Sequence, residues 1–179
     1  MTNGGGWTVF QRQMNGAQDF DLYWSDYKAG FGNLSENFWL GNEKIYSLTK
    51  QRRYELRIDM INVNSVPLYV VYDSFNITDE SQEYTLRLGK YVGDADDELS
   101  YQNNFPFTTR DNVNDGIDYS SFDYSSLFFD LGVQVQGGWW YMRWQDGDFP
   151  SLNSPYGTDK KFWGNKVIHY SDMKIRAIA

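Results

Sequence analysis

The sequence predicts an α+β fold that is rich in loops. Aromatic residues make up 18% of the 179 residues and glycine accounts for 16 of them, a mixture typical of short strands joined by structured turns. Residues 1–92 alternate short helical and strand patterns, whereas residues 93–170 are dominated by Asp, Asn, Ser, Gly and aromatic side chains. We therefore expect a single domain over residues 1–179, with a scaffold over 1–92, a loop-rich binding lobe over 93–170 and a last strand over 171–179.

The chain is expected to open with a strand and a short helix. Three glycines precede an alternating pattern that begins at Trp7, which suits a half-buried strand. Asp19 or Asp21 can cap a helix that places Tyr27 on its apolar face and ends at Gly30. Both elements are short, as the composition requires.

One more helix and several strands complete the expected scaffold. Residues 33–42 are interpreted as a loop that carries Phe38 and Trp39 inward. Residues 42–50 form a second helix with Ile45 on its apolar side. Further strands are expected at residues 52–61, 66–75, 83–90 and 173–178.

Charge and composition exclude several classes of function. The formal charge of −8 opposes binding to a phosphate backbone, and no stretch is long and apolar enough for a spanning helix. His169 is the only histidine and cysteine is absent, so the usual zinc ligand sets are excluded. His169 is interpreted as a structural residue in a strand or at its edge. Because of the charge and the lack of a long apolar stretch, we expect no nucleic-acid partner and no membrane insertion. The sequence has no phosphate-binding glycine loop and no distinct acid and base pair, so we also expect no organic cofactor and no enzymatic activity.

Several strings in a fixed order carry a family resemblance. GGGWTVFQRQMNG at residues 4–16 and YKAGFGNLSENFWLGN at 27–42 are followed by YELRIDM, VVYDSF, LSYQNNFPFTTRD, GGWWY at 137–141 and DMKIR at 172–176. Together they resemble the fibrinogen C-terminal domain family, the module of ficolins, tachylectins, tenascins, angiopoietins and the fibrinogen chains. The resemblance implies a mixed or antiparallel central sheet, a loop-rich ligand-binding lobe and secretion.

The absence of cysteine departs from that family, which carries a disulfide near its ligand site. The resemblance places Leu131 and Trp144 at the two cysteine positions and Gln145 at the position of a pocket histidine. A leucine and a tryptophan can fill the space of a lost disulfide with apolar side chains. We therefore expect a packed replacement for the disulfide.

An acidic segment after FTTR suggests a calcium site. Calcium takes six to eight oxygen ligands, and the family carries an Asp-x-Asp pattern at this position. Asp111 matches the first carboxylate, Val113 occupies the second position, and Asp115 or Asp118 offers a shifted register. Calcium binding through Asp111 and Asp115 and a solvated Asn/Asp turn both remain open.

The segment around GGWWY supplies the candidate ligand site. Arg143 among aromatic residues suits an acidic N-acetylated sugar such as sialic acid, because aromatic faces stack on sugar rings and a guanidinium binds a carboxylate. The alternative is that the tryptophans belong to the core and that Arg143 pairs with Asp146 or Asp148. The predicted ligand-binding residues are Trp140, Tyr141, Arg143, Trp144, Gln145, Asp146, Asp148 and Tyr156.

These observations predict an extracellular, non-catalytic lectin that recognises N-acetylated sugars on glycans or glycoproteins, as ficolins do in innate immunity. The alternative is a protein-interaction module of the angiopoietin or fibrinogen type, in which the same lobe binds a receptor or a peptide. Weak sites favour a homo-oligomer or a multivalent parent protein. Two glycosylation acceptor triplets, Asn33-Leu34-Ser35 and Asn76-Ile77-Thr78, agree with secretion.

Overall fold

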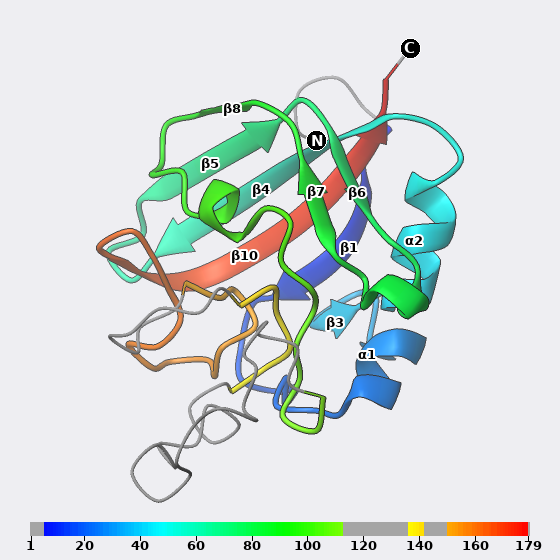
Figure 1. Ribbon diagram of the computed structural model, residues 1–179. Coiled ribbons are helices and arrows are strands. Elements are labelled where there is room, and N and C mark those ends of the chain that lie inside the picture. The colour runs from blue at the N-terminus through cyan, green and yellow to red at the C-terminus, as the bar shows by residue number, and fades with distance from the viewer. Residues whose placement is uncertain (1–5, 113–135, 142–149, 179) are drawn as a thin grey trace, which may run out of the picture.

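A computed structural model describes residues 6–112, 136–141 and 150–178 and shows a twisted sheet of antiparallel pairs (Figure 1). The sheet has eight strands in the order β2-β3-β1-β10-β4-β5-β8, with β9 paired to β10, and a second sheet pairs β6 with β7. The strands are β1 Thr8–Gln13, β2 Phe31–Gly32, β3 Phe38–Trp39, β4 Tyr54–Asn62, β5 Pro67–Tyr72, β6 Phe75–Ile77, β7 Leu86–Leu88, β8 Tyr91–Gly93, β9 Phe162–Trp163 and β10 Lys166–Ala177. The helices are α1 Trp24–Ala29 and α2 Asn42–Thr49, with single 3-10 turns η1 Glu80–Gln82 and η2 Leu99–Gln102. Short helices and an antiparallel sheet confirm the α+β prediction.

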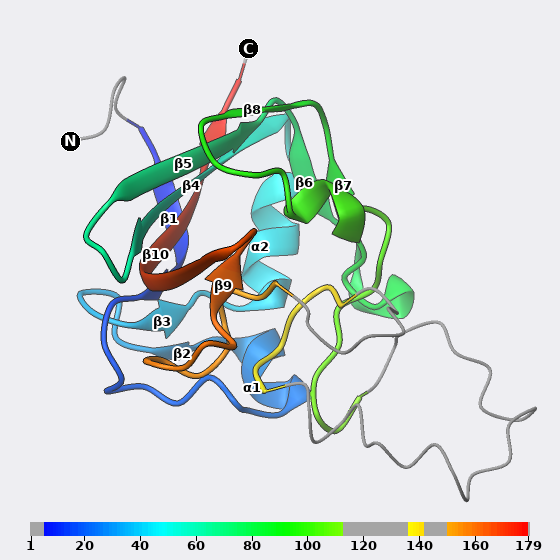
Figure 2. The ribbon, with the colours of Figure 1, turned by 90° about the vertical axis from the view of Figure 1, so that its left-hand side faces the viewer.

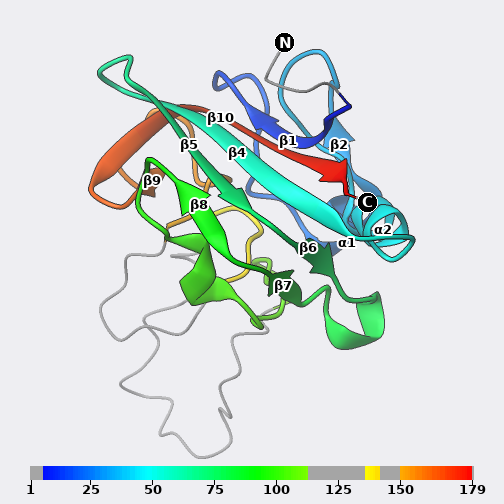
Figure 3. The same cartoon turned by 90° about the horizontal axis from the view of Figure 1, so that it is seen from above.

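Strand β10 organises the sheet because it pairs with both β1 and β4 (Figure 3). It begins at Lys166, seven residues before the expected start at residue 173, so the predicted strand was too short. The pairing with β4 shifts between Ile168 and Tyr170, which leaves His169 as a bulge in the strand. A bulge breaks the two-residue alternation, and this explains why the pattern concealed the first part of β10.

Helix α1 begins differently from the prediction. Neither Asp19 nor Asp21 caps it. Tyr23 occupies the N-cap position, where its N–H donates to Asp26 Oδ2 at 3.2 Å. The next N–H, that of Trp24, donates to Asp111 Oδ1 at 2.8 Å, although the two residues are 87 positions apart. A distant carboxylate therefore replaces the expected local cap, while α2 begins at Asn42 and buries Ile45 as predicted.

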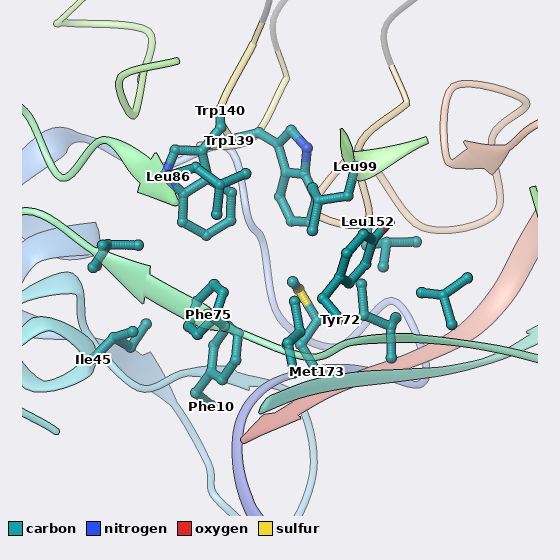
Figure 4. Packing of buried hydrophobic residues seen from close by; sticks show 14 of the residues in the cluster. Phe10, Ile45, Tyr72, Phe75, Leu86, Leu99, Trp139, Trp140, Leu152 and Met173 are labelled. Atoms are coloured by element: carbon teal, nitrogen blue, oxygen red, sulfur yellow. The ribbon is translucent and has the colours of Figure 1, made fainter. Parts of the chain in front are cut away.

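The core lies against the inner face of the sheet (Figure 4). In β4, buried Leu56, Ile58 and Met60 alternate with more exposed charged residues, as the two-residue period of a strand requires. The core also receives Trp139 and Trp140 from the 136–141 segment, and Figure 4 shows Trp140 beside Leu86 of β7. The loop-rich half of the chain thus contributes directly to the hydrophobic core.

Candidate functional site

A buried polar network joins the start of the chain to the loop-rich half. Gln11 Nε2 on β1 donates to Leu152 O at 3.2 Å, Asn153 Oδ1 at 3.1 Å and Ser171 Oγ at 3.2 Å. Gln13, two residues along the same strand, donates through Nε2 to Ser154 O at 3.2 Å. Strand β1 therefore fixes the 151–154 segment, which leads to the predicted ligand residue Tyr156.

Asn153 connects this network to the GGWWY segment. Its Nδ2 donates to Gly138 O at 2.9 Å. Gly137 has a φ of +101°, and a Cβ built on it would lie 2.2 Å from Asn153 O. Only glycine tolerates both that backbone angle and that approach. Gly137 is thus required for contact between the 136–141 and 150–154 segments.

The aromatic residues of GGWWY are buried. Trp139 and Trp140 are 0% exposed, and their indole Nε1 atoms donate to Gln102 Oε1 at 2.5 Å and to Tyr84 O at 2.8 Å. Tyr141 is 5% exposed and donates its hydroxyl to Gly137 O at 2.7 Å, and burial raises its pKa. Trp140 therefore offers no open face for a sugar in this conformation. Trp139 and Trp140 are core residues, as the alternative prediction has it.

Among the described residues, Tyr156 is the predicted ligand residue that stays partly exposed, and it contacts a neighbouring histidine. Its hydroxyl oxygen lies 2.5 Å from His169 Nε2, and the two rings meet edge to face with centroids 5.0 Å apart. His169 is exposed because the bulge in β10 projects it from the strand. Gly16 lies against the Tyr156 ring, where an added Cβ would be 3.4 Å from Cδ1. The pair presents an aromatic edge with polar atoms at the surface.

A buried lysine lies between Tyr156 and His169 in the sequence. Lys161 is 0% exposed, and its ammonium donates to Gln13 O at 3.4 Å. Within residues 6–112, 136–141 and 150–178, no carboxylate oxygen lies within 4.0 Å of that ammonium. Burial lowers the pKa of Lys161 to about 7. Lys161 is the residue before β9 and therefore links that strand to β1. At slightly alkaline pH most of its amine is uncharged.

The polar residues of this network were not identified from the sequence. The pattern in β1 was interpreted as a half-buried strand, yet Gln11 and Gln13 are both buried. A register shift between Val9 and Gln11 interrupts the pairing with β10, and Phe10 and Gln11 are both fully buried there. The sequence signal that indicates this network is the presence of two glutamines in a strand that enters the core, because buried amides require hydrogen-bond partners.

The predicted calcium site has one described carboxylate. Asp111 is exposed, and its Oδ1 accepts hydrogen bonds from Trp24 N at 2.8 Å and from Thr109 Oγ1 at 2.7 Å. Val113, Asp115 and Asp118 lie outside the described residues. Among the residues that are described, no group of three or more His, Cys, Asp or Glu side chains is arranged to hold a metal ion. Asp111 has a structural role in this conformation, and calcium binding stays a prediction.

The remaining predicted ligand residues fall in a stretch that the structure does not describe. Arg143, Trp144, Gln145, Asp146 and Asp148 belong to residues 142–149. The expected apolar replacement of the disulfide, through Leu131 and Trp144, also falls outside the described residues. The site geometry therefore rests on Tyr156, His169 and the buried network of β1 and residues 151–154. Figure 2 shows β9 beside the first half of β10, the strand that carries His169.

Comparison with known proteins identifies the family. A family model described as fibrinogen beta and gamma chains, C-terminal globular domain, matches residues 1–174. The chain belongs to this family. Domains of the family are generally binding modules without enzymatic activity.

The relatives are longer proteins. The chain is 39% identical to fibrinogen-like protein A of Apostichopus parvimensis over 98% of this chain and 62% of that protein. It is 35% identical to ryncolin-4 of Cerberus rynchops over 98% of this chain and 51% of that protein. It is 39% identical to tenascin-R of Gallus gallus over 94% of this chain but only 12% of that protein. The family domain is therefore a part of multidomain proteins, and such relatives are mostly secreted or extracellular.

Solved structures share the fold. The fibrinogen-like globe domain of human ANGPTL6 superimposes with a TM-score of 0.79 at 33% identity and covers 99% of this chain and 81% of that one. The lamprey fibrin D-dimer complexed with the peptide ligand Gly-His-Arg-Pro-amide gives a TM-score of 0.72 at 28% identity, covering 100% of this chain and 65% of that one. Within the described residues, none of the helices has the length and apolar character needed to span a membrane.

Proposed function

We propose that this domain is a non-catalytic lectin that binds N-acetylated sugars beside Tyr156 and His169. The observation that carries the proposal is the contact between Tyr156 and His169. The Tyr156 hydroxyl oxygen lies 2.5 Å from Nε2 of His169, which occupies the bulge of β10. An aromatic face stacks on the C–H face of a sugar ring, while phenol and imidazole groups hydrogen-bond to hydroxyl or acetamido groups. Since buried hydrogen bonds fix the preceding 151–154 segment, little conformational freedom is lost when a sugar binds.

Recognition of an acidic sugar extends this proposal. Arg143 follows the buried GGWWY segment in the sequence, and a guanidinium binds a carboxylate through two parallel hydrogen bonds. The sequence is therefore the support for sialic acid as the ligand and for Arg143 as its carboxylate-binding residue. The proposal for N-acetylated sugars stands independently of this extension.

The second candidate function is peptide or protein binding in the same lobe. It is favoured by the lamprey fibrin D-dimer, which was solved with the ligand Gly-His-Arg-Pro-amide, and by the charge of −8 on this chain. An acidic domain attracts a ligand that carries arginine. For either ligand, linked copies in a longer extracellular protein would raise weak single-site affinity.

A glycan array tests the lectin proposal. Saturable binding to N-acetylated glycans, competed away by free N-acetylated sugar, is the expected result. Tyr156→Ala is expected to reduce this binding at least about tenfold, equivalent to the ~1.4 kcal/mol of one stacking contact. Tyr101→Ala is the matched control, because Tyr101 is an aromatic side chain with 62% exposure outside the pair. An array without signal would remove the lectin proposal.

Two further arms separate the alternatives. Arg143→Ala is expected to abolish binding to sialylated glycans while the thermal midpoint stays nearly unchanged; a collapse of the midpoint would assign Arg143 to structure. The labelled peptide Gly-His-Arg-Pro-amide tests the second candidate. Peptide binding that free N-acetylated sugar does not displace, together with a silent array, would favour the protein-interaction module.

A further inference from the structure

The two acceptor triplets for N-linked glycans lie in different structural settings. Asn33-Leu34-Ser35 forms the turn between β2 and β3, at one edge of the main sheet, whereas Asn76-Ile77 belongs to strand β6 and is followed by Thr78. An Asn-x-Ser/Thr triplet is modified where it remains at the surface of a secreted protein. We propose that Asn33 is an N-glycosylation site of this domain and that Asn76 is not.

The turn at Asn33 is compact and exposed. Asn33 N donates to Asn37 O at 2.9 Å and Glu36 N donates to Asn33 O at 2.9 Å, which closes the hairpin. The side-chain oxygen of Asn33 accepts a hydrogen bond from Ser35 N at 3.0 Å. Residues 33–36 are all exposed. This turn brings the first and third residues of the triplet together and presents them to solvent.

The reactive atom of Asn33 is available. Its Oδ1 is used in the turn, but among the described residues nothing accepts a hydrogen bond from its Nδ2. In the modification, Nδ2 attacks the anomeric carbon of an oligosaccharide carried on a lipid diphosphate. A C–N bond forms, the C–O bond to the diphosphate breaks, the amide nitrogen loses one proton to a base of the transferase, and the lipid diphosphate leaves.

A glycan at this position also has a physical role. Leu34, the middle residue of the triplet, is a large apolar side chain with 66% of its surface exposed. Contact between an apolar side chain and water is unfavourable. A glycan attached to the preceding residue would cover Leu34 without disturbing Phe38 and Trp39 of β3, which are 2% and 1% exposed.

The triplet at Asn76 is engaged in structure. Asn76 is opposite Arg87 in the β6–β7 pair, and the middle residue, Ile77, is 2% exposed. The Thr78 hydroxyl accepts a hydrogen bond from Thr85 N at 2.8 Å and donates to Gln82 O at 3.1 Å. This triplet therefore lacks the exposure of the first.

Expression in a eukaryotic secretory host, behind a secretion signal, tests the proposal. The mass of the protein from medium and from cells is compared before and after digestion with a peptide N-glycosidase. We expect one glycan on the wild type, none on Asn33→Gln and one on Asn76→Gln. Ser35→Ala, which removes only the hydroxyl of the triplet and keeps Asn33, is expected to lose the glycan too.

The opposite pattern would overturn the proposal. Loss of the glycan in Asn76→Gln, two glycans on the wild type, or a wild type without any glycan in either fraction would each contradict it. Because the result is read as mass and not as sugar binding, it is independent of the proposed lectin function.

Discussion

At the scale of single residues, two buried lysines show how surroundings decide the state of a charge. Lys174 is 4% exposed, contacts Asp59 Oδ2 and lies 3.0 Å from Asp172 Oδ1. Lys161 is 0% exposed and has a carbonyl oxygen at 3.4 Å as its hydrogen-bond acceptor. Carboxylates compensate the charge of Lys174, whereas among the described residues Lys161 has only this carbonyl, which leaves its charge poorly solvated. Hence burial lowers the pKa of Lys161 to about 7.

We predict that the free energy of unfolding rises between pH 7 and pH 9 because of Lys161. In the unfolded chain the lysine keeps a pKa of about 10.4, so in this range the unfolded state binds more protons than the folded state. The penalty of the buried charge is fully present below pH 7 and is relieved as pH rises. The slope contributed by this group approaches about 1.4 kcal/mol per pH unit, measurable by urea unfolding at several pH values.

Lys161→Met is expected to remove this slope and to raise stability at pH 7 by about 1–3 kcal/mol, because a buried charge is replaced by an apolar chain of similar length. The adjacent Lys160 is exposed, which makes Lys160→Met the matched control, expected to change neither quantity. Equal pH slopes in the wild type and Lys161→Met would show that Lys161 stays protonated in the folded protein.

At the scale of elements, the contact between the 136–141 and 150–154 segments depends on Gly137. Gly137→Ala is expected to destabilise the fold by at least about 3 kcal/mol, because the new Cβ would lie 2.2 Å from Asn153 O at a φ of +101°. Gly157 has a φ of +77° with nothing within 4 Å of an added Cβ. Gly157→Ala should therefore cost only about 1 kcal/mol of backbone strain. Comparable losses for both, measured by thermal unfolding, would refute the packing role of Gly137.

Helix α1 depends on a carboxylate from a distant segment. Asp111→Ala removes the acceptor for Trp24 N and is expected to lower the free energy of unfolding by about 1 kcal/mol in buffer with a chelator. If calcium also binds at Asp111, the wild type will be less stable with chelator than without it, since a ligand bound only to the folded state stabilises that state. A variant that matches the wild type in chelator would mean that the cap contributes nothing.

Elements with a regular pattern were predictable, and those shaped by long-range contacts were not. Helix α2 and strand β4 follow local periodicity, and their predicted positions agree closely with Asn42–Thr49 and Tyr54–Asn62. The cap of α1 comes from Asp111, which no local pattern indicates. The first half of β10 was missed because the bulge at His169 breaks the alternation. In each failure, a contact between distant parts of the chain overrides the local pattern.

At the scale of the whole molecule, scaffold and site differ in how far sequence determines them. The family strings lie largely in strands and buried turns, where backbone hydrogen bonds and core packing limit variation. Ligand residues lie in loops, which vary with little cost to the fold. Tyr156 is a ligand residue predicted from the sequence, and His169 is interpreted from its neighbours as a structural residue in a strand or at its edge. Their contact could not be predicted from the local pattern, because it depends on the bulge of β10.

The single histidine of the chain offers a direct test of the proposal that N-acetylated sugars bind beside Tyr156 and His169. In ¹⁵N-labelled protein, the imidazole nitrogens give one set of NMR signals, which reports on this position alone. Titration with N-acetylglucosamine or sialic acid is predicted to shift these signals saturably, while glucose leaves them in place. Imidazole signals that stay unchanged at sugar concentrations that saturate binding elsewhere on the protein would contradict the account.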